Sequence, residues 1–268
     1  MRVLLTGGSG FIGSHVAEVL LTQTDAEITF LERLSHSGNL NRLAQMPGWQ
    51  EHRKRCRVVH HDLRSPVSRL LQRQIGPADV ILHLAALTHV DRAIASPFSA
   101  VMDNVVGTVN ILELARNVGC HRFFYFSTDE VFGPAPEGVA YKEWDRYHSG
   151  NPYAASKAGA EEMALAYHNT YGLPVIVTHT MNAFGPRQHP EKYIPSTIRR
   201  VRDGETVMVH ADKACTKAGS RFYIDAKEIG SALIFLLRAG QPGEKYNIVG
   251  SREVDNLSLA FQIAEVVG

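Results

Sequence analysis

The chain has 268 residues, of which 44% are hydrophobic, and a formal net charge of +1. This length and hydrophobic content are enough for one composite domain with a sizeable core. The near-balance of charge argues against a surface for general nucleic-acid binding, which would be strongly basic, so any anionic ligand has to be met by a few local groups.

Cysteine and histidine spacing argues against two further kinds of site. The three cysteines lie far apart without CxxC spacing, which disfavours a disulfide framework or a zinc site and favours a reducing, cytoplasmic setting. The 13 histidines form no HxxxH or HExxH pattern, so we expect no metal ion. The N-terminus begins with an apolar, strand-like run and has no charged leader, so we expect neither export nor a membrane anchor.

The first half of the chain alternates short apolar runs with helix-length amphipathic segments. This alternation is typical of βαβ units and predicts an α/β fold with helices on a doubly wound parallel sheet. The expected strands are residues 2–6, 27–31, 57–60, 80–84 and 122–127, and the expected helices are residues 11–21 and 104–118.

Farther along, a long helix is expected at residues 153–171, because residues 149–152 can open it and Gly172 can close it. Residues 174–178 indicate the next strand. The pattern then loosens into a basic helix near residues 198–202 and a last helix at residues 257–267. We expect residues 1–180 to form one domain and residues 181–268 a smaller lobe that is interleaved with the last elements of the sheet.

A glycine-rich turn follows the first expected strand and opens the first expected helix. Residues 6–13, Thr-Gly-Gly-Ser-Gly-Phe-Ile-Gly, contain a GxxGxxG pattern. Glycines in this pattern form a tight turn, let the backbone approach a pyrophosphate and let the helix pack closely on the strand, while the anion faces the helix N-terminus. The residues expected to bind the pyrophosphate of a dinucleotide are Gly7, Gly10, Phe11, Ile12 and Gly13.

Two acidic residues at strand ends favour a particular dinucleotide. Glu32, about 20 residues beyond the glycine turn, can accept hydrogen bonds from the adenosine ribose and repels the additional phosphate of NADP, so NAD is the expected cofactor. The neighbouring Arg33 leaves NADP open. Asp62, just after the third expected strand, can reach the adenine amino group, although it can equally be an ordinary helix N-cap.

Tyr153 and Lys157 form a YxxxK motif near the start of the long expected helix. Four residues apart, they lie on one helix face and can reach one ligand. A tyrosine pKa of about 10 makes a poor base unless cations stabilise the phenolate, and Lys157 and the positive nicotinamide ring would supply those charges. Lys157 can also bind the nicotinamide ribose, and Thr128, at the end of the fifth expected strand, can hydrogen-bond the reacting hydroxyl.

Taken in this order, the motifs resemble those of the extended short-chain dehydrogenase/reductase family, the NAD-dependent epimerases and dehydratases. Residues 127–133, Ser-Thr-Asp-Glu-Val-Phe-Gly, narrow the resemblance to dTDP-glucose 4,6-dehydratases. Other similar stretches, spread over nearly the whole chain, are residues 37–40, 83–86, 88–92, 104–108 and 190–195. The resemblance implies a Rossmann fold with a C-terminal substrate-binding lobe, and it places beside the cofactor Leu63, Leu84, Ala85 and Ala86.

The resemblance also implies a reaction. Tyr153 would take the C4 hydroxyl proton of a nucleotide hexose while NAD accepts the hydride. Glu130 would then remove the C5 proton, Asp129 would protonate the departing C6 hydroxyl, and hydride return to C6 would give a 4-keto-6-deoxyhexose. Two alternatives stay open: a nucleotide-sugar 4-epimerase, which needs no acid and base at C5 and C6, and a protein that senses NAD without turnover.

Substrate contacts are implied in the same way. By the resemblance, Asn182 and Arg221 contact the nucleotide diphosphate, for which an arginine suits a bidentate contact. Thr88 and His89 lie near the sugar or the nicotinamide. Lys192 is a further candidate for the diphosphate, although a solvated lysine explains it equally well.

Three features depart from the family pattern. Leu87 stands where these dehydratases usually have a glutamate, and residues 220–225 only approximate the family's Arg-Asp-aromatic segment. The chain ends at Gly268, within an expected helix, where the family usually continues. We therefore expect a substrate lobe that is short at its C-terminus, as a compact variant or by truncation, and the preferred nucleotide base stays open.

The helices expected at residues 104–118 and 153–171 resemble those through which members of this family pair. We therefore expect a homodimer held by a four-helix bundle. The expected ligand is a nucleotide sugar, and neither a nucleic acid nor a membrane is expected as a partner.

Overall fold

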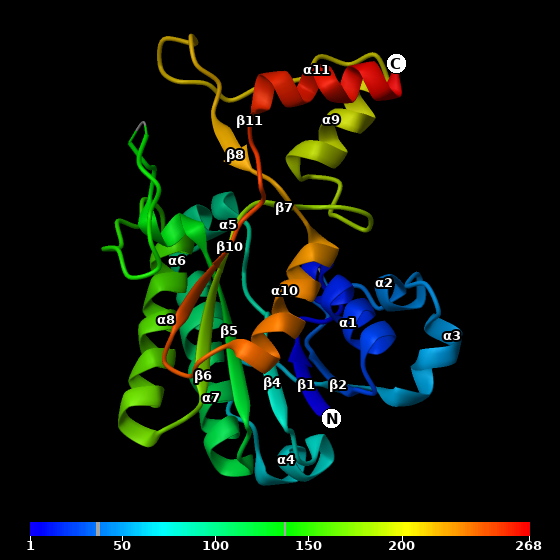
Figure 1. Ribbon diagram of the computed structural model, residues 1–268, viewed down its shortest axis with the longest axis vertical. Helices are drawn as coiled ribbons and strands as arrows, with labels where there is room; N and C mark the ends of the chain where they lie inside the picture. The colour runs from blue at the N-terminus through cyan, green and yellow to red at the C-terminus, as the bar shows by residue number, and fades with distance from the viewer. Residues whose placement is uncertain (36–37, 137) are drawn as a thin grey trace.

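The computed structural model describes residues 1–35, 38–136 and 138–268. Its largest sheet has seven parallel strands in the order β10-β6-β5-β4-β1-β2-β3 (Figure 1). These strands are β1 (Arg2–Thr6), β2 (Glu27–Glu32), β3 (Cys56–His60), β4 (Val80–His83), β5 (Arg122–Thr128), β6 (Val175–Thr180) and β10 (Lys245–Ile248). The chain winds outwards from β1 in both directions, which confirms the expected Rossmann-type α/β fold.

Helices cover both faces of the sheet, which is why its strands carry near-continuous apolar runs. On one face lie α1 (Phe11–Gln23), α2 (Asn41–Ala44) and α10 (Ala226–Ala239), whose apolar side chains share one core cluster with the sheet. A second cluster lies on the other face, under α4 (Arg69–Ile75), α7 (Gly107–Val118) and α8 (Pro152–Tyr171). The short α3 (Trp49–His52) and η1 (Arg53–Arg55) lead into β3.

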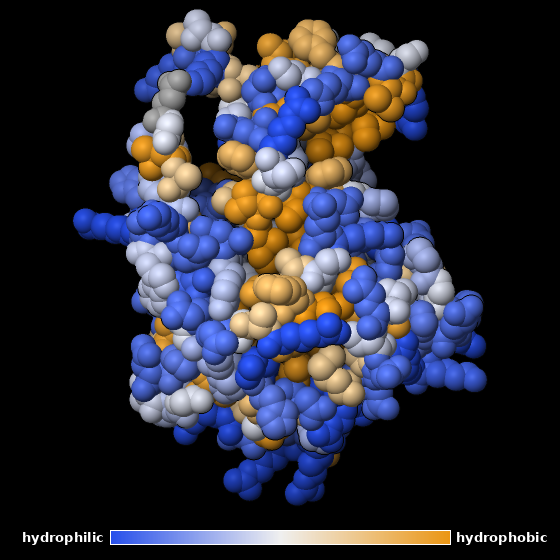
Figure 2. Space-filling view, in the orientation of Figure 1, coloured by the Kyte–Doolittle hydropathy of each residue, from blue (hydrophilic) through white to orange (hydrophobic). Residues whose placement is uncertain are grey.

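A smaller group of elements lies beyond the carboxyl ends of the sheet strands, at the top of Figure 1. It contains α9 (Tyr193–Arg202), β8 (Ser220–Phe222), β11 (Glu253–Asp255) and α11 (Asn256–Val267), with β8 antiparallel to β11. Two short parallel strands, β7 (Ala183–Phe184) and β9 (Ile224–Asp225), connect it to the sheet, and α10 and β10 then return to the main layers. Figure 2 shows apolar side chains gathered over α9 and α11, where Leu257 and Phe261 are exposed.

The helix expected at residues 104–118 was only partly right. Three short elements, α5 (Val90–Ala95), α6 (Pro97–Ala100) and the π-helical turn η2 (Val101–Val106), precede α7, which begins at Gly107. Asn104 in η2 is buried, and its side-chain amide accepts from the Leu87 backbone N–H at 2.7 Å and donates to the Leu87 carbonyl at 3.1 Å. Apolar periodicity does not reveal a π turn, because the turn is held by these polar contacts to another segment.

The helix α8 begins and ends at the residues from which its ends were predicted. The Asn151 side chain accepts from the Ala154 backbone N–H at 2.9 Å, and Pro152 occupies the first turn. Gly172, with φ of 69°, ends the helix in the left-handed conformation that glycine adopts readily. These caps fix the start of α8 and with it the YxxxK motif.

Three expectations concern a membrane span, a metal site and a stretch of the chain that is only partly described. Across residues 1–35, 38–136 and 138–268, no helix is long and apolar enough to cross a membrane. In the same residues, no group of three or more histidine, cysteine, aspartate or glutamate side chains is placed to hold a metal ion. Ser37, in the family-like stretch at residues 37–40, lies outside the described residues.

Candidate active site

A cleft of about 580 Å³ opens at the carboxyl ends of the sheet strands. In open α/β sheets, ligands bind in this position. The cleft brings together every expected site residue except Arg221. Its lining includes Gly7, Gly10, Phe11, Ile12, Gly13, Glu32, Asp62, Leu63, Leu84, Ala85, Ala86, Thr88, His89, Thr128, Asp129, Glu130, Tyr153, Lys157, Asn182 and Lys192.

The glycine turn forms a cradle in which side chains have no room. Gly7 has φ of 71°, and a Cβ there would lie 2.7 Å from the Ala85 backbone nitrogen. A Cβ on Gly13 would lie 2.2 Å from the Gly7 carbonyl oxygen, which accepts from the Gly10 N–H at 3.0 Å. Because the N-terminus of α1 opens directly beside this turn, backbone N–H groups and the helix dipole can meet a pyrophosphate there.

Glu32 is buried at the end of β2 and held by Ser9 of the glycine turn. The Ser9 backbone N–H and hydroxyl donate to its two carboxylate oxygens at 3.0 and 2.6 Å. Burial raises the pKa of Glu32, while the Ser9 hydrogen bonds oppose this shift. A carboxylate fixed here, together with the glycine cradle, fits the adenosine ribose and pyrophosphate of NAD.

Asp62 is not a helix N-cap, so that alternative is wrong. Its carboxylate accepts hydrogen bonds from the Arg64 backbone N–H at 3.0 Å and from the Arg64 guanidinium. Both residues lie in a turn in which the Ser65 N–H donates to the Asp62 carbonyl. The helix that follows begins at Arg69, and Ser68 is its cap. The hydrogen bond from Arg64 is the main reason that the pKa of Asp62 falls to about 2.

Tyr153 and Lys157 lie in one turn of α8 and are both buried. The Lys157 ammonium donates to the Phe126 carbonyl and lies 4.4 Å from the centre of the Tyr125 ring. Burial lowers the pKa of Lys157 to about 7. Burial, and then repulsion by Glu130, raise the pKa of Tyr153, and the nearby Thr128 hydroxyl partly offsets this shift. Tyr153 therefore needs added positive charge before it can act as a base.

Asp129 and Glu130 form the start of the 3-10 turn η3 (Asp129–Phe132), directly after β5. The Thr128 hydroxyl accepts from the Glu130 N–H at 3.3 Å and donates to the Asp129 carboxylate at 3.2 Å. Burial and then repulsion by Glu130 raise the pKa of Asp129. Asp129 therefore holds a proton more readily than an ordinary aspartate, which suits it to be the acid of an acid and base pair.

Two asparagines that the sequence did not single out organise these groups. Asn151 caps α8 and its amide also donates to the Glu130 carboxylate at 3.1 Å. Asn104 joins Leu87 to α8, because its amide donates to Ser156 Oγ at 2.8 Å. Both positions lay within motifs that the sequence revealed, but the contacts join segments that only the fold brings together.

One end of the cleft lies between the sheet and the smaller group of elements. His89, the residue directly before α5, has its Nε2 3.7 Å from the carboxylate of Glu191 in the loop before α9. Arg221 is exposed and lies outside the cleft lining of the described residues, and its guanidinium donates to the Ser220 carbonyl at 2.7 Å. Its charge nevertheless lowers the pKa of Asp129 somewhat, against the larger effect of burial.

Comparison with known proteins decides the family. Residues 3–249 match the model of the NAD dependent epimerase/dehydratase family. The chain belongs to this family. Like the extended short-chain dehydrogenases/reductases that it resembles in sequence, it is an NAD-dependent enzyme, and the expected cofactor is confirmed.

Curated relatives match over the whole chain. It is 40% identical over 268 residues to the low-salt glycan biosynthesis protein Agl12 of Haloferax volcanii, covering 100% of this chain and 83% of that protein. It is 39% identical over 274 residues to a dTDP-glucose 4,6-dehydratase of Streptomyces niveus, covering 100% of this chain and 78% of that protein.

Solved structures give the same family and two kinds of enzyme within it. DesIV, a dTDP-glucose 4,6-dehydratase from Streptomyces venezuelae with NAD and TYD bound, has a TM-score of 0.89 at 37% identity, over 99% of this chain and 80% of that one. A UDP-glucose 4-epimerase from Thermus thermophilus in complex with NAD has a TM-score of 0.88 at 30% identity, covering 100% of this chain and 84% of that one. The fold and the cofactor are thus shared by dehydratases and epimerases.

Proposed function

We propose that this enzyme is a nucleotide-sugar 4,6-dehydratase, which converts a dTDP- or UDP-hexose to the 4-keto-6-deoxyhexose. The observation that carries the proposal is the carboxyl pair Asp129 and Glu130, which lines the same cleft as Tyr153 and Lys157. An epimerase needs the tyrosine and the lysine but has no use for a second proton-transfer pair. The names of the curated relatives agree with this choice.

In this proposal three side chains, Tyr153, Glu130 and Asp129, transfer protons. Tyr153, supported by Lys157 and aligned by Thr128, takes the proton of the C4 hydroxyl, while NAD supplies the hydride acceptor and later the donor. The new C4 ketone acidifies the C5 hydrogen, so Glu130 can remove that proton. Asp129, with its raised pKa, gives a proton to the C6 hydroxyl, which leaves as water. When the hydride returns to C6, Glu130 gives a proton back to C5, and the 4-keto-6-deoxyhexose is complete.

The diphosphate would lie toward the smaller group of elements. Asn182 and Lys192 line that part of the cleft and can donate to phosphate oxygens. Arg221 would have to turn from the Ser220 carbonyl to take part. We include Arg221 in the proposed set because its charge already acts on Asp129.

A product screen tests the proposed function. The enzyme would be incubated with dTDP-, UDP-, CDP- and GDP-hexoses, and products would be read by mass spectrometry for the loss of one water and by carbonyl trapping for the ketone. We expect a dehydrated keto sugar from at least one of these. An inverted hexose of unchanged mass would instead assign a 4-epimerase, and bound NAD without any product would assign a sensor.

We also propose a homodimer that pairs η2, α7 and α8 of two chains in a four-helix bundle. Beside these helices, Ile94, Phe98 and Val101 expose apolar side chains, with 76% of Phe98 accessible. Size-exclusion chromatography with light scattering at micromolar concentration should give twice the mass of the chain. Phe98→Glu should give monomer, whereas Phe235→Glu, at another exposed position, on α10, should not. A monomeric wild type would contradict the proposal.

A further inference from the structure

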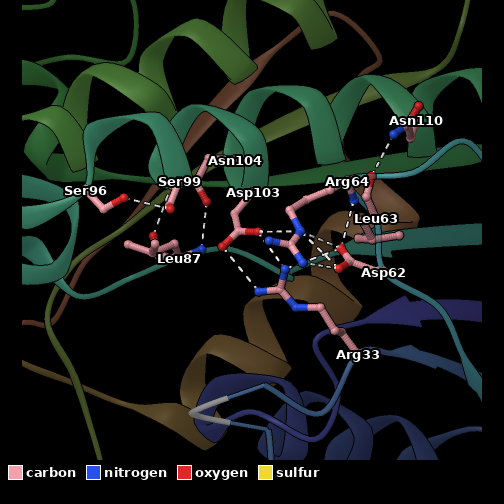
Figure 3. Close-up of polar contacts among 10 residues, drawn as sticks. All are labelled: Arg33, Asp62, Leu63, Arg64, Leu87, Ser96, Ser99, Asp103, Asn104 and Asn110. Atoms are coloured by element: carbon pink, nitrogen blue, oxygen red, sulfur yellow. Dashed lines mark hydrogen bonds and ion pairs between the residues drawn. The ribbon is translucent and has the colours of Figure 1, made fainter.

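Arg33 follows Glu32 at the end of β2 and lines the cleft beside it. Two carboxylates hold its guanidinium, as Figure 3 shows. Nη1 and Nη2 donate to the two oxygens of Asp103 at 2.8 and 3.2 Å, and Nη1 also contacts Asp62 at 3.3 Å. The Arg33 side chain is therefore fixed from two other segments of the chain, the turn after β3 and the π turn η2.

Asp103, the ion-pair partner of Arg33, has a fixed position because hydrogen bonds to other segments hold η2 in place. Its side chain is 14% exposed, and the next residue, Asn104, is buried and bonded to both Leu87 and Ser156. Arg64 completes the cluster, with contacts to Asp62 at 2.5 Å and Asp103 at 3.8 Å. The charges of the two arginines and the two aspartates therefore cancel at this end of the cleft.

The pairing matters because of what an arginine at this position could otherwise bind. In Rossmann folds that take NADP, an arginine near the acidic position at the end of the second strand accommodates the 2′-phosphate. The bidentate contact with Asp103 uses the same fork of N–H groups that would grip a phosphate. A 2′-phosphate at Arg33 would have to displace the Asp103 carboxylate or lie against its negative charge.

We propose that Asp103 is a cofactor-selectivity residue, which withholds the Arg33 guanidinium from the 2′-phosphate of NADP. Glu32 opposes the same phosphate directly, so two carboxylates exclude NADP by different routes. The two routes are coupled, because a freed Arg33 can serve the phosphate fully only when Glu32 no longer repels it. The proposal concerns cofactor binding and holds for whichever sugar reaction the enzyme catalyses.

The test is a double-mutant cycle on cofactor-free protein. Dissociation constants for NADH and NADPH would be measured by nicotinamide fluorescence for the wild type, Glu32→Gln, Asp103→Asn and the double variant. We expect each single variant to shift the NADPH-to-NADH preference by about tenfold or less, and the double variant to exceed the product of the singles by about tenfold. NADH affinity of Asp103→Asn should stay within about threefold of wild type.

Further variants separate selectivity from general effects. Arg33→Met in the double variant should remove the gain in NADPH binding, and Asp91→Asn, an exposed acid on α5, should change neither constant. Asp103→Ser repeats the test if the asparagine variant does not fold. Any of four results would overturn the proposal. The effects of the two single variants on the NADPH-to-NADH preference could be strictly additive, or the gain in NADPH binding could survive in Arg33→Met. NADH and NADPH binding could fall equally in the variants, or the wild type could bind both cofactors equally.

Discussion

Glu130→Gln is expected to stop the elimination while oxidation at C4 continues. The glutamine keeps the size of the side chain and can still accept from the Asn151 amide, which contacts Glu130 at 3.1 Å, but it cannot take the C5 proton. Turnover should fall by about 10²- to 10⁴-fold, the usual contribution of general acid–base catalysis. In deuterium oxide, quenched single-turnover samples should contain a 4-keto-hexose that keeps its C6 hydroxyl and carries no solvent deuterium at C5.

Asp129→Asn provides the complementary result. Exchange at C5 should continue, because Glu130 is intact, while loss of the C6 hydroxyl slows. Glu162→Gln, at an exposed position on α8, is the matched control and should keep wild-type turnover. Continued C5 exchange in Glu130→Gln would show that another group is the base.

Lys157→Met should lower activity and stabilise the cofactor-free protein at the same time. Activity falls because Tyr153 loses the cation that supports its phenolate. Stability rises because the wild type buries an amine whose charged form is disfavoured there, and a lysine pKa lowered from about 10.4 to about 7 costs about 4 kcal/mol at pH 7. The hydrogen bond to the Phe126 carbonyl, which methionine cannot make, offsets about 1.5–3 kcal/mol of this gain. Urea unfolding of both proteins at pH 7, alongside the exposed control Lys213→Met, measures the difference.

The pH dependence of this stability has a definite sign. The pKa of Lys157 is about 7 in the folded protein, whereas the unfolded chain has an ordinary lysine value of about 10.4. Between these values the unfolded state binds more protons, so the penalty is full below pH 7 and fades as pH rises. From pH 7 to pH 9 the wild type should gain about 2 kcal/mol relative to Lys157→Met. A parallel pH profile for the two proteins would contradict a depressed lysine pKa.

Local sequence signals predicted six of the seven strands of the sheet and the motifs at its carboxyl edge. The glycine turn, Glu32 and the capped start of α8 each depend on residues close together in the chain, so short patterns reveal them. The π turn η2 was missed because Asn104 takes its hydrogen bonds from Leu87 and Ser156, which lie in other segments. The edge strand β10 was missed too, since its Lys245 and Asn247 break the apolar run.

Ion pairs between distant segments of the chain were the other feature that the sequence could not predict. From the sequence, Arg33 left NADP open, because nothing in the pattern links it to Asp103, 70 residues away. From the sequence, Asp62 could be a helix cap or an adenine contact. It is not a cap, because Ser68 caps the next helix, and its partners are Arg64 and Arg33. The adenine contact stays a prediction. The resemblance implied Arg221 at the diphosphate, but the sequence does not specify the direction of a side chain, and the Arg221 guanidinium donates to the Ser220 carbonyl.

The most direct test of the dehydratase assignment is the fate of a deuterium label at C4 of the hexose. With the preferred nucleotide sugar deuterated at C4, the product should be a 4-keto-6-deoxyhexose with the label at C6, read by NMR and mass spectrometry. The carboxyl pair Asp129 and Glu130 makes this transfer possible, because it removes the C5 proton and the C6 hydroxyl between the two hydride steps. Label that remains at C4 of an inverted sugar would contradict the assignment and identify an epimerase.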